Sequence, residues 1–295
     1  MKDLRESEKG ILVLDSGDLL FKRFSNPAPE NELKGISEKA YLIIESLNLM
    51  GYDAIGIGED DLTLGKDFLM EISKKANFPF LSSNLFDEAS GNTLFRSSII
   101  KEVNGLRIGI FSLLSSDFFT GPFDPRKELK PKTDLILLLS HLGYVKDIEV
   151  AQTVPGIHVI VGGHTGINLP YPPVIKNIVI LQTTSRGMFI GRLDLLFNSN
   201  EPIFYNSATK ISLENNLSQI NQRLNSKETP EAEKAQWRKS KEETERTLTQ
   251  LRDKNQFTNH IIPLQDQMKE DPNIKTLVDA YKAKFQKTEI PPVPK

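Results

Sequence analysis

Three apolar segments of this chain each end in a side chain that can bind a metal ion. Residues 134–141 end at His141, residues 156–164 end at His164, and residues 11–18 end at Asp18. Short apolar runs of this kind are typical of strands buried in a sheet. Because ligands in open α/β folds bind outside the carboxyl ends of the strands, we expect these three side chains to meet in one crevice.

The order of the predicted elements indicates a sheet covered by helices. A strand at 11–18, a helix at 36–50 that ends at Gly51, a strand at 54–58, a helix at 62–76 and a strand at 78–84 give a β-α-β-α-β order, which favours parallel strands. Asn104-Gly105 is a common hairpin turn, so strands at 98–103 and 106–114 should be antiparallel and the sheet mixed. Further strands are expected at 134–141, 158–164, 174–183, 187–197 and 202–207.

The composition changes after Thr209. Apolar residues recur there at the alternating spacings of four and three that indicate a helix: Leu213, Leu217, Ile220 and Leu224. A polar break follows at 225–230, and a second, charged helix is expected over 231–254. We interpret this stretch as a helical hairpin that serves as a structural arm or self-associating element. The expected organisation is a main domain at 1–209, the hairpin at 210–256, and a C-terminal helix with a linker-like tail at 257–295.

The composition limits the chemistry and the partners. The chain has no cysteine, so any metal must be held by His, Asp, Glu or Asn. A net charge of −2 over 295 residues does not favour nucleic acid as a partner. No apolar run approaches the roughly 20 residues of a membrane span, so the chain as written is expected to be cytoplasmic.

Glu59 follows the strand at 54–58 and completes a set of four donors with Asp18, His141 and His164. Two imidazoles with two carboxylates suit Zn, Mn, Fe or Co. Glu59, Asp60 and Asp61 form an acidic cluster that has three interpretations: a solvated loop, a cluster neutralised by a metal ion, or a site where Asp60 acts as a general base.

The order of several blocks along the chain resembles that of a known family. Residues 11 to about 197, and again 261–281, are similar to the catalytic domain of the 5′-nucleotidase and UDP-sugar hydrolase branch of the calcineurin-like metallophosphoesterases. The blocks that carry the resemblance are 14–18, 51–58, 78–84, 139–143, 161–165 and 187–195. The resemblance implies a four-layered α/β/β/α sandwich of mixed sheets, here with a C-terminal helical hairpin.

The family also implies a two-metal phosphoesterase, from which this chain departs. By resemblance Asp18 is the aspartate that bridges two ions, His141 and His164 bind the second ion, and Glu59 stands where the family has a metal-binding asparagine. The opening Asp-x-His pair of the first site is absent, Gly166 replaces another of its histidines, and Asp60 replaces the catalytic histidine. We therefore expect one divalent ion rather than two. A trimmed start would explain the absent pair, whereas the internal replacements indicate divergence.

The expected function is metal-dependent hydrolysis of a small phosphate ester or nucleotide, and the alternative is an inactive relative that binds or assembles. Asp60 is the candidate catalytic residue, and Asn84 and Arg186 are candidates for substrate binding because both follow strands. If the N-terminus is incomplete, the resemblance implies a periplasmic or cell-surface location.

Overall fold

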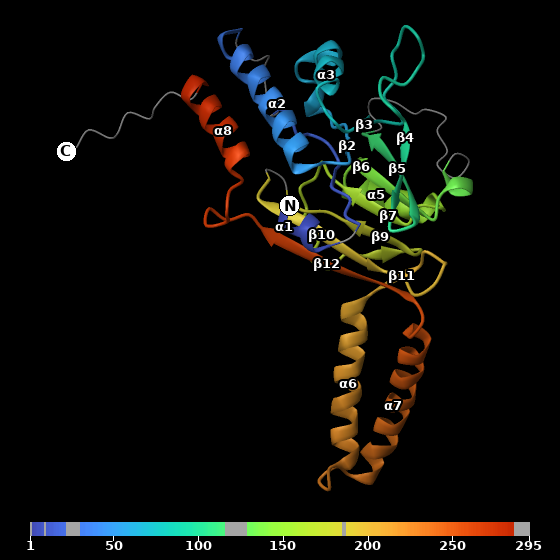
Figure 1. Cartoon of the computed structure of the whole chain (residues 1–295). Helices are drawn as coiled ribbons and strands as arrows, with labels where there is room; N and C mark the ends of the chain where they lie inside the picture. Colours follow the sequence, from blue (N-terminus) through green and yellow to red (C-terminus); the bar gives the residue numbers. More distant parts are fainter. Residues whose placement is uncertain (1, 9, 22–29, 116–128, 185–186, 286–295) are drawn as a thin grey trace, which may run out of the picture.

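The computed structural model describes residues 2–8, 10–21, 30–115, 129–184 and 187–285. Within these residues the strands form three sheets, with orders β1-β2-β3, β4-β5-β6-β7-β9-β8 and β10-β12-β11 (Figure 1). The first two sheets carry the expected metal ligands, and the third closes the sandwich and supports the helical hairpin.

The first sheet is parallel, as the β-α-β-α-β order predicts. It consists of β1 (Leu14–Asp15), β2 (Ala54–Gly56) and β3 (Phe80–Leu81). The connections contain α2 (Glu30–Met50) and, after the short 3-10 turn η1 (Asp60–Leu62), α3 (Gly65–Ser73). Ile44 of α2, Ile55 of β2 and Leu69 of α3 lie in one buried cluster, so both helices cover the same face.

The second sheet is mixed. The strands β5, β6, β7 and β9 are parallel, and the edge strands β4 and β8 are antiparallel to their neighbours. The predicted turn at Asn104-Gly105 is present with positive φ at both residues, the geometry that lets a two-residue turn follow the strand twist. The bounds are β4 Ser98–Val103, β5 Leu106–Leu114, β6 Leu135–His141, β7 Val159–Gly162, β8 Val174–Ile175 and β9 Ile178–Leu181.

One of the expected strands is divided into two strands by a turn. Residues 174–183 were expected to form a single strand, but β8 and β9 are joined by a turn at Lys176-Asn177, where both residues have positive φ. An asparagine accepts this backbone conformation more easily than most residues, and a two-residue turn needs it.

β6 shows why the two sheets stack in layers. Alternate residues of a strand point to opposite faces. Leu135 and Leu137 pack into the cluster between the two sheets, whereas Ile136 and Leu138 pack into a cluster with α5 (Tyr144–Thr153). Both faces of β6 are therefore buried, and the order helix, sheet, sheet, helix confirms the predicted four-layered fold.

The third sheet corrects the expected C-terminal boundary. β10 (Phe189–Leu196) and β11 (Phe204–Asn206) both pair with β12 (Asn255–Pro263), so the chain returns to the sandwich after the helical hairpin. The expected boundary at 257 falls inside β12. β12 is the central strand of this sheet and its Phe257 is fully buried, but most of its other residues are polar, so residues 255–263 carry little strand signal.

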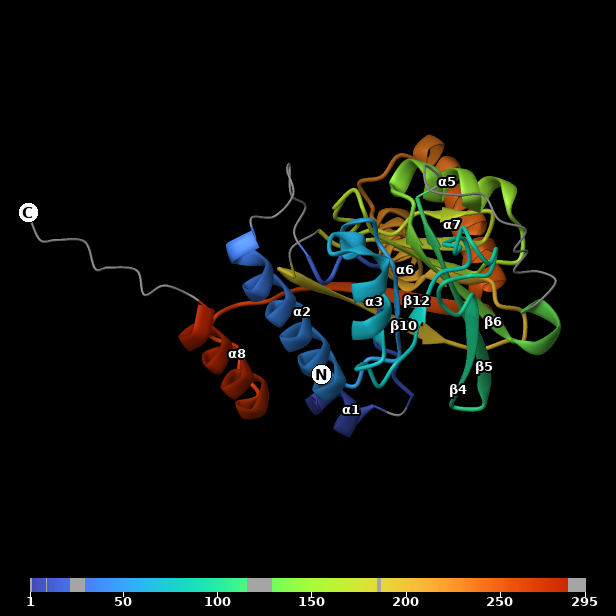
Figure 2. The same ribbon diagram turned by 90° about the horizontal axis from the view of Figure 1, so that it is seen from above.

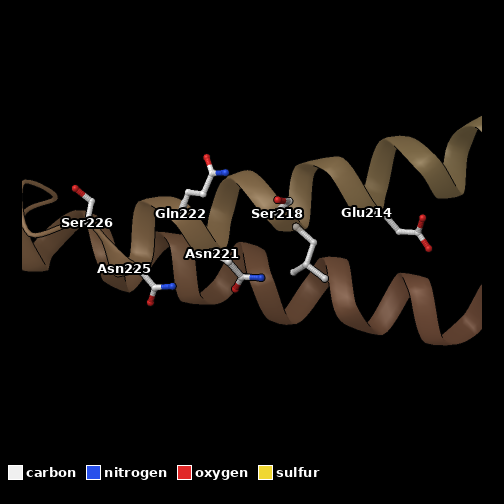
Figure 3. Close-up of a pocket in the computed structure, with 7 residues that line it drawn as sticks. Glu214, Ser218, Asn221, Gln222, Asn225 and Ser226 are labelled. Carbon is white, nitrogen blue, oxygen red and sulfur yellow. The ribbon is translucent and has the colours of Figure 1, made fainter.

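The predicted helical hairpin is present as α6 (Ser207–Asn225) and α7 (Glu231–Leu251), which project together from the third sheet (Figure 1). It is an insertion between β11 and β12 rather than a C-terminal element. Ile220 and Thr244 are the buried residues of the two helices. A shallow groove runs along α6 beside Leu217, lined by polar side chains such as Asn221 and Asn225 (Figure 3).

The predicted final helix is α8 (Pro272–Phe285), which lies beside α2 in both views (Figures 1 and 2). The Tyr281 hydroxyl donates to the Gly35 carbonyl at 3.1 Å, and Lys284 pairs with Glu38 at 3.1 Å. The short helix α1 (Lys2–Ser7) precedes β1, and the 3-10 turn η2 (Lys130–Lys132) precedes β6. Among the described residues, no helix has the length and apolar character needed to cross a bilayer.

Candidate metal centre

The four predicted ligands lie together. Asp18 follows β1, Glu59 follows β2, His141 is the last residue of β6 and His164 follows β7. Each offers one ligand atom, and these atoms all lie within 4.8 Å of one another. The four side chains therefore lie at the carboxyl ends of strands from the two stacked sheets.

His141 is oriented by a second hydrogen bond. It is 1% exposed, and its Nδ1 lies 3.0 Å from the Ser16 carbonyl oxygen. Because a carbonyl only accepts, Nδ1 is the donor and Nε2 is directed at Asp18 Oδ2, 2.9 Å away, and Glu59 Oε2, 3.3 Å away. Outer contacts of this type fix the ring orientation of metal-binding histidines.

His164 meets the other oxygen of Glu59. Its Nδ1 lies 2.5 Å from Glu59 Oε1, and the two imidazole rings are 5.3 Å apart and nearly perpendicular. His164 and Asp18 both have a left-handed backbone, with φ of 67° and 60°. This conformation is uncommon for residues other than glycine, and such strain tends to accumulate at functional sites.

Two glycines allow the loops to approach this closely. A Cβ at Gly58 would lie 2.1 Å from Asp18 Oδ1, and a Cβ at Gly163 would lie 2.6 Å from Ser16 Oγ and 3.1 Å from His141 Nδ1. Any side chain at either position would therefore displace a predicted ligand or the group that orients it.

The donor set fits a divalent cation. Glu59 Oε2 is buried and accepts no hydrogen bond, and the imidazole of His141 lies beside it at 3.3 Å; a buried carboxylate oxygen of this kind needs a cationic partner, which a metal ion or a protonated His141 would supply. Burial alone would lower the pKa of His141, but Asp18, Glu59 and the Ser16 carbonyl raise it to about 9. A cation between these carboxylates would replace the proton on Nε2. Across residues 2–8, 10–21, 30–115, 129–184 and 187–285, this is the one cluster of His, Asp and Glu with such geometry.

Two of the other candidate residues, Asp60 and Asn84, make hydrogen bonds within the protein. The Asp60 backbone N–H donates to Asp18 Oδ1 at 2.8 Å. The Asn84 side-chain amide makes two hydrogen bonds with the backbone of Leu114: it accepts from the N–H at 2.9 Å and donates to the carbonyl at 2.8 Å. Arg186 lies outside the described residues. The roles of Asp60 as a base and of Asn84 and Arg186 in substrate binding stay predictions.

Asp61 is a structural residue of the site that the sequence did not distinguish from its acidic neighbours. It is 3% exposed and accepts hydrogen bonds from the backbone N–H groups of Asp18, Gly58 and Leu20, at 2.8, 3.0 and 3.0 Å. Burial raises the pKa of Asp61 to about 6, against the lowering effect of these hydrogen bonds. This carboxylate ties the Asp18 loop to the Glu59 loop.

Asp61→Ala is expected to lower the free energy of unfolding by about 3 kcal/mol, because three backbone N–H groups, two of them in buried hydrogen bonds, lose their acceptor. Urea unfolding measures the change. The control is Asp67→Ala, which removes an exposed aspartate from α3 and should change stability by less than about 0.5 kcal/mol. Equal stabilities of the two variants would contradict this role of Asp61.

His158 is away from the cluster and acts as a buried acceptor. Its Nδ1 accepts from the Ile136 backbone N–H at 2.9 Å. Burial and then the charge of Lys130 lower the pKa of His158 from 6.5 to about 4. Between these two values the unfolded chain binds more protons than the folded one, so this group makes stability rise with pH and fall on acidification.

His158→Asn retains an acceptor but does not titrate. On going from pH 7 to pH 5, the wild type is expected to lose about 1–2 kcal/mol more unfolding free energy than the variant. Chemical denaturation at both values gives the difference, in which the contributions of carboxylates common to both proteins cancel. Parallel pH profiles for the two proteins would contradict the assignment.

Comparisons with known proteins show what the chain and its fold are similar to. No family model matches the chain. The 5′-nucleotidase of Vibrio vulnificus is 25% identical over 239 residues, covering 65% of this chain and 42% of the relative. A 5′-nucleotidase precursor structure from Thermus thermophilus gives a TM-score of 0.54 at 25% identity, covering 68% of this chain and 45% of that one. The calcineurin-like phosphoesterase YfkN of Bacillus subtilis gives a TM-score of 0.54 at 21% identity, covering 66% and 73%. The chain thus spans less than half the length of these nucleotidases.

Proposed function

We propose that the chain belongs to the calcineurin-like metallophosphoesterases, in their 5′-nucleotidase branch, and that it hydrolyses small phosphate esters at one divalent-metal site. The observation that carries the proposal is the convergence of Asp18, Glu59, His141 and His164 at the carboxyl ends of four strands. Substrates of the nucleoside monophosphate type are proposed from the names of the relatives.

The four residues would hold the ion through two carboxylates and two imidazoles. A cation of the Mn, Zn, Co or Fe type, when bound, polarises a phosphoryl oxygen and lowers the pKa of a water ligand. One ion is proposed rather than two, because the position of a further family histidine is Gly166 and because the described residues provide one cluster.

The protein residues supply orientation and charge. The Ser16 carbonyl fixes the His141 ring, so Nε2 is aimed at the site before any ion binds. Glu59 adds a negative charge that offsets part of the ion's charge. Asp60, which lies next to Glu59, is proposed to accept a proton from the attacking water, and Asn84 and Arg186 are proposed to contact the substrate.

A second candidate function is ligand binding without turnover. It is favoured by Asp60, which stands where the family has its catalytic histidine and cannot provide a positive charge near the leaving oxygen at neutral pH. On this alternative the site would bind a metal and a phosphate ester but release no product.

Phosphate release tests the proposal. Wild-type protein is incubated with 5′-AMP or an aryl phosphate in the presence of Mn²⁺, Co²⁺ or Zn²⁺, beside His164→Ala and the control His260→Ala, whose side chain is exposed. Metal-dependent release by the wild type and the control, lost in His164→Ala, is the expected result. No release with any metal, together with measurable Mn²⁺ binding, would favour the binding function instead.

We also propose self-association through the hairpin and a periplasmic or cell-surface location. The hairpin projects from the sandwich and exposes Ile211, which is 57% accessible, near its base. Light scattering of the intact chain tests the first proposal, since a monomer at all concentrations would exclude it. Cell fractionation tests the second.

A further inference from the structure

His164 occupies a strained turn. The Thr165 N–H donates to the Gly163 carbonyl at 2.8 Å, a hydrogen bond between residues two apart, and the central His164 has φ of 67°. A γ-turn with positive φ at its centre is the rare and strained form. The side chain of His164 is 35% exposed, whereas that of His141 is 1% exposed, so packing restrains His164 far less.

A buried glutamine holds this turn from both sides. Gln182 is 3% exposed and directly follows β9, whose Leu181 pairs with Val161 of β7. Its Nε2 donates to the Gly163 carbonyl at 2.9 Å and to Thr165 Oγ1 at 3.0 Å. Because a backbone carbonyl only accepts, this contact also fixes which end of the amide faces the turn.

The start of α5 provides the opposite support. The Tyr144 N–H donates to Thr165 Oγ1 at 3.3 Å, and a Cβ at Gly143 would lie 3.3 Å from Cδ2 of the His164 ring. The hydroxyl of Thr165 therefore connects the Gln182 amide with the first turn of α5, and His164 lies between them.

We propose that Gln182 is a positioning residue that holds His164 in its strained conformation and thereby sets the affinity of the site for metal. The inference rests on the proposed metal site. Without the amide, the Gly163 carbonyl and the Thr165 hydroxyl lose the donor that they share, and the turn relaxes to an ordinary backbone conformation. The His164 imidazole then moves away from Glu59. Binding of a metal ion must bring the ring back to its position, which weakens the affinity.

The test is Mn²⁺ titration by calorimetry and by electron paramagnetic resonance. Gln182→Met keeps the length of the side chain and removes its donors. We expect a 10–100-fold loss of Mn²⁺ affinity, the range for outer partners of metal ligands, at unchanged stoichiometry. The matched control Gln152→Met lies at an exposed position of α5 and should bind Mn²⁺ as the wild type does.

A double-mutant cycle with His164→Ala separates positioning from general damage. If Gln182 acts through His164, then Gln182→Met should cause no further loss of affinity once His164 is absent. A loss of the same size in both backgrounds would overturn the inference. If Gln182→Met does not fold, Thr165→Val replaces it in the cycle, because it removes the hydroxyl on the same turn, and the same two outcomes decide.

Two results separate an error about the metal site from an error about the role of Gln182. Wild-type protein that binds no Mn²⁺ would overturn both the metal site and the role of Gln182. Wild-type binding that is unchanged in Gln182→Met would overturn the role of Gln182 alone and leave the proposed function standing.

Discussion

His141→Asn is expected to weaken Mn²⁺ binding by more than 100-fold while leaving the protein folded. The asparagine amide can still donate to the Ser16 carbonyl, as His141 Nδ1 does at 3.0 Å, but it has no counterpart of Nε2. Loss of a metal ligand should exceed the roughly 10–100-fold effect of losing an outer partner. Calorimetric titration measures the affinity, and circular dichroism checks the fold.

The control for this prediction is His260→Asn, which changes a histidine that is 56% exposed on β12. Mn²⁺ affinity of that variant should equal that of the wild type. Wild-type affinity in His141→Asn would contradict the assignment of His141 as a ligand, and an equal loss in both variants would indicate non-specific binding.

Gly58→Ala is expected to lower the free energy of unfolding by about 3 kcal/mol and to weaken Mn²⁺ binding at the same time. The added Cβ would lie 2.1 Å from Asp18 Oδ1 and 2.7 Å from the Asp18 backbone nitrogen. A side-chain atom can rotate away, but the backbone nitrogen is held by Asp61, so the Asp18 loop must move. Urea unfolding and Mn²⁺ titration of one preparation give both values.

The matched control is Gly35→Ala on α2. A Cβ at Gly35 would meet only the Phe285 ring at 3.5 Å, an ordinary contact, and alanine favours the helix by up to about 1 kcal/mol. Gly35→Ala should therefore be neutral or stabilising. Equal loss of stability in the two variants would show that the close approach of Gly58 to Asp18 has no special role.

The meeting of Asp18, Glu59, His141 and His164 was predictable because each lies at or just after the end of a strand. β6 and β7 are apolar along most of their length, and His141 and His164 mark the points where that pattern stops. Chain order alone then brings strand ends to one edge of the sandwich. The hairpin turn at Asn104-Gly105 was predictable for a local reason, since few other residue pairs adopt positive φ at both positions.

The supporting residues were not predictable from the sequence. Asp61 is an acidic residue beside Glu59 and Asp60 in the sequence, and its burial and its three backbone hydrogen bonds depend on how η1 packs. Gln182 acts across 19 residues of chain, through contacts that form only when β7 and β9 pair. β12 was missed because it is mostly polar, with Phe257 as its one fully buried aromatic residue, and lacks the continuous apolar run that marks β6.

By the family resemblance, Gly166 and Asp60 replace histidines and Glu59 replaces an asparagine, so the cluster itself contains one replacement. Glu59 retains an oxygen that reaches each histidine, at 2.5 Å from His164 and 3.3 Å from His141. Its charge replaces the neutral amide that the family resemblance implies at this position. A site with two carboxylates and two imidazoles suits one divalent ion without help from a second.

The most direct test of the account is an anomalous diffraction map from crystals of the wild-type chain soaked in Mn²⁺. We expect one peak per chain, within bonding distance of Asp18, Glu59, His141 and His164. A map with no peak among these four side chains, or with two peaks there, would contradict the single metal site on which the proposed function depends.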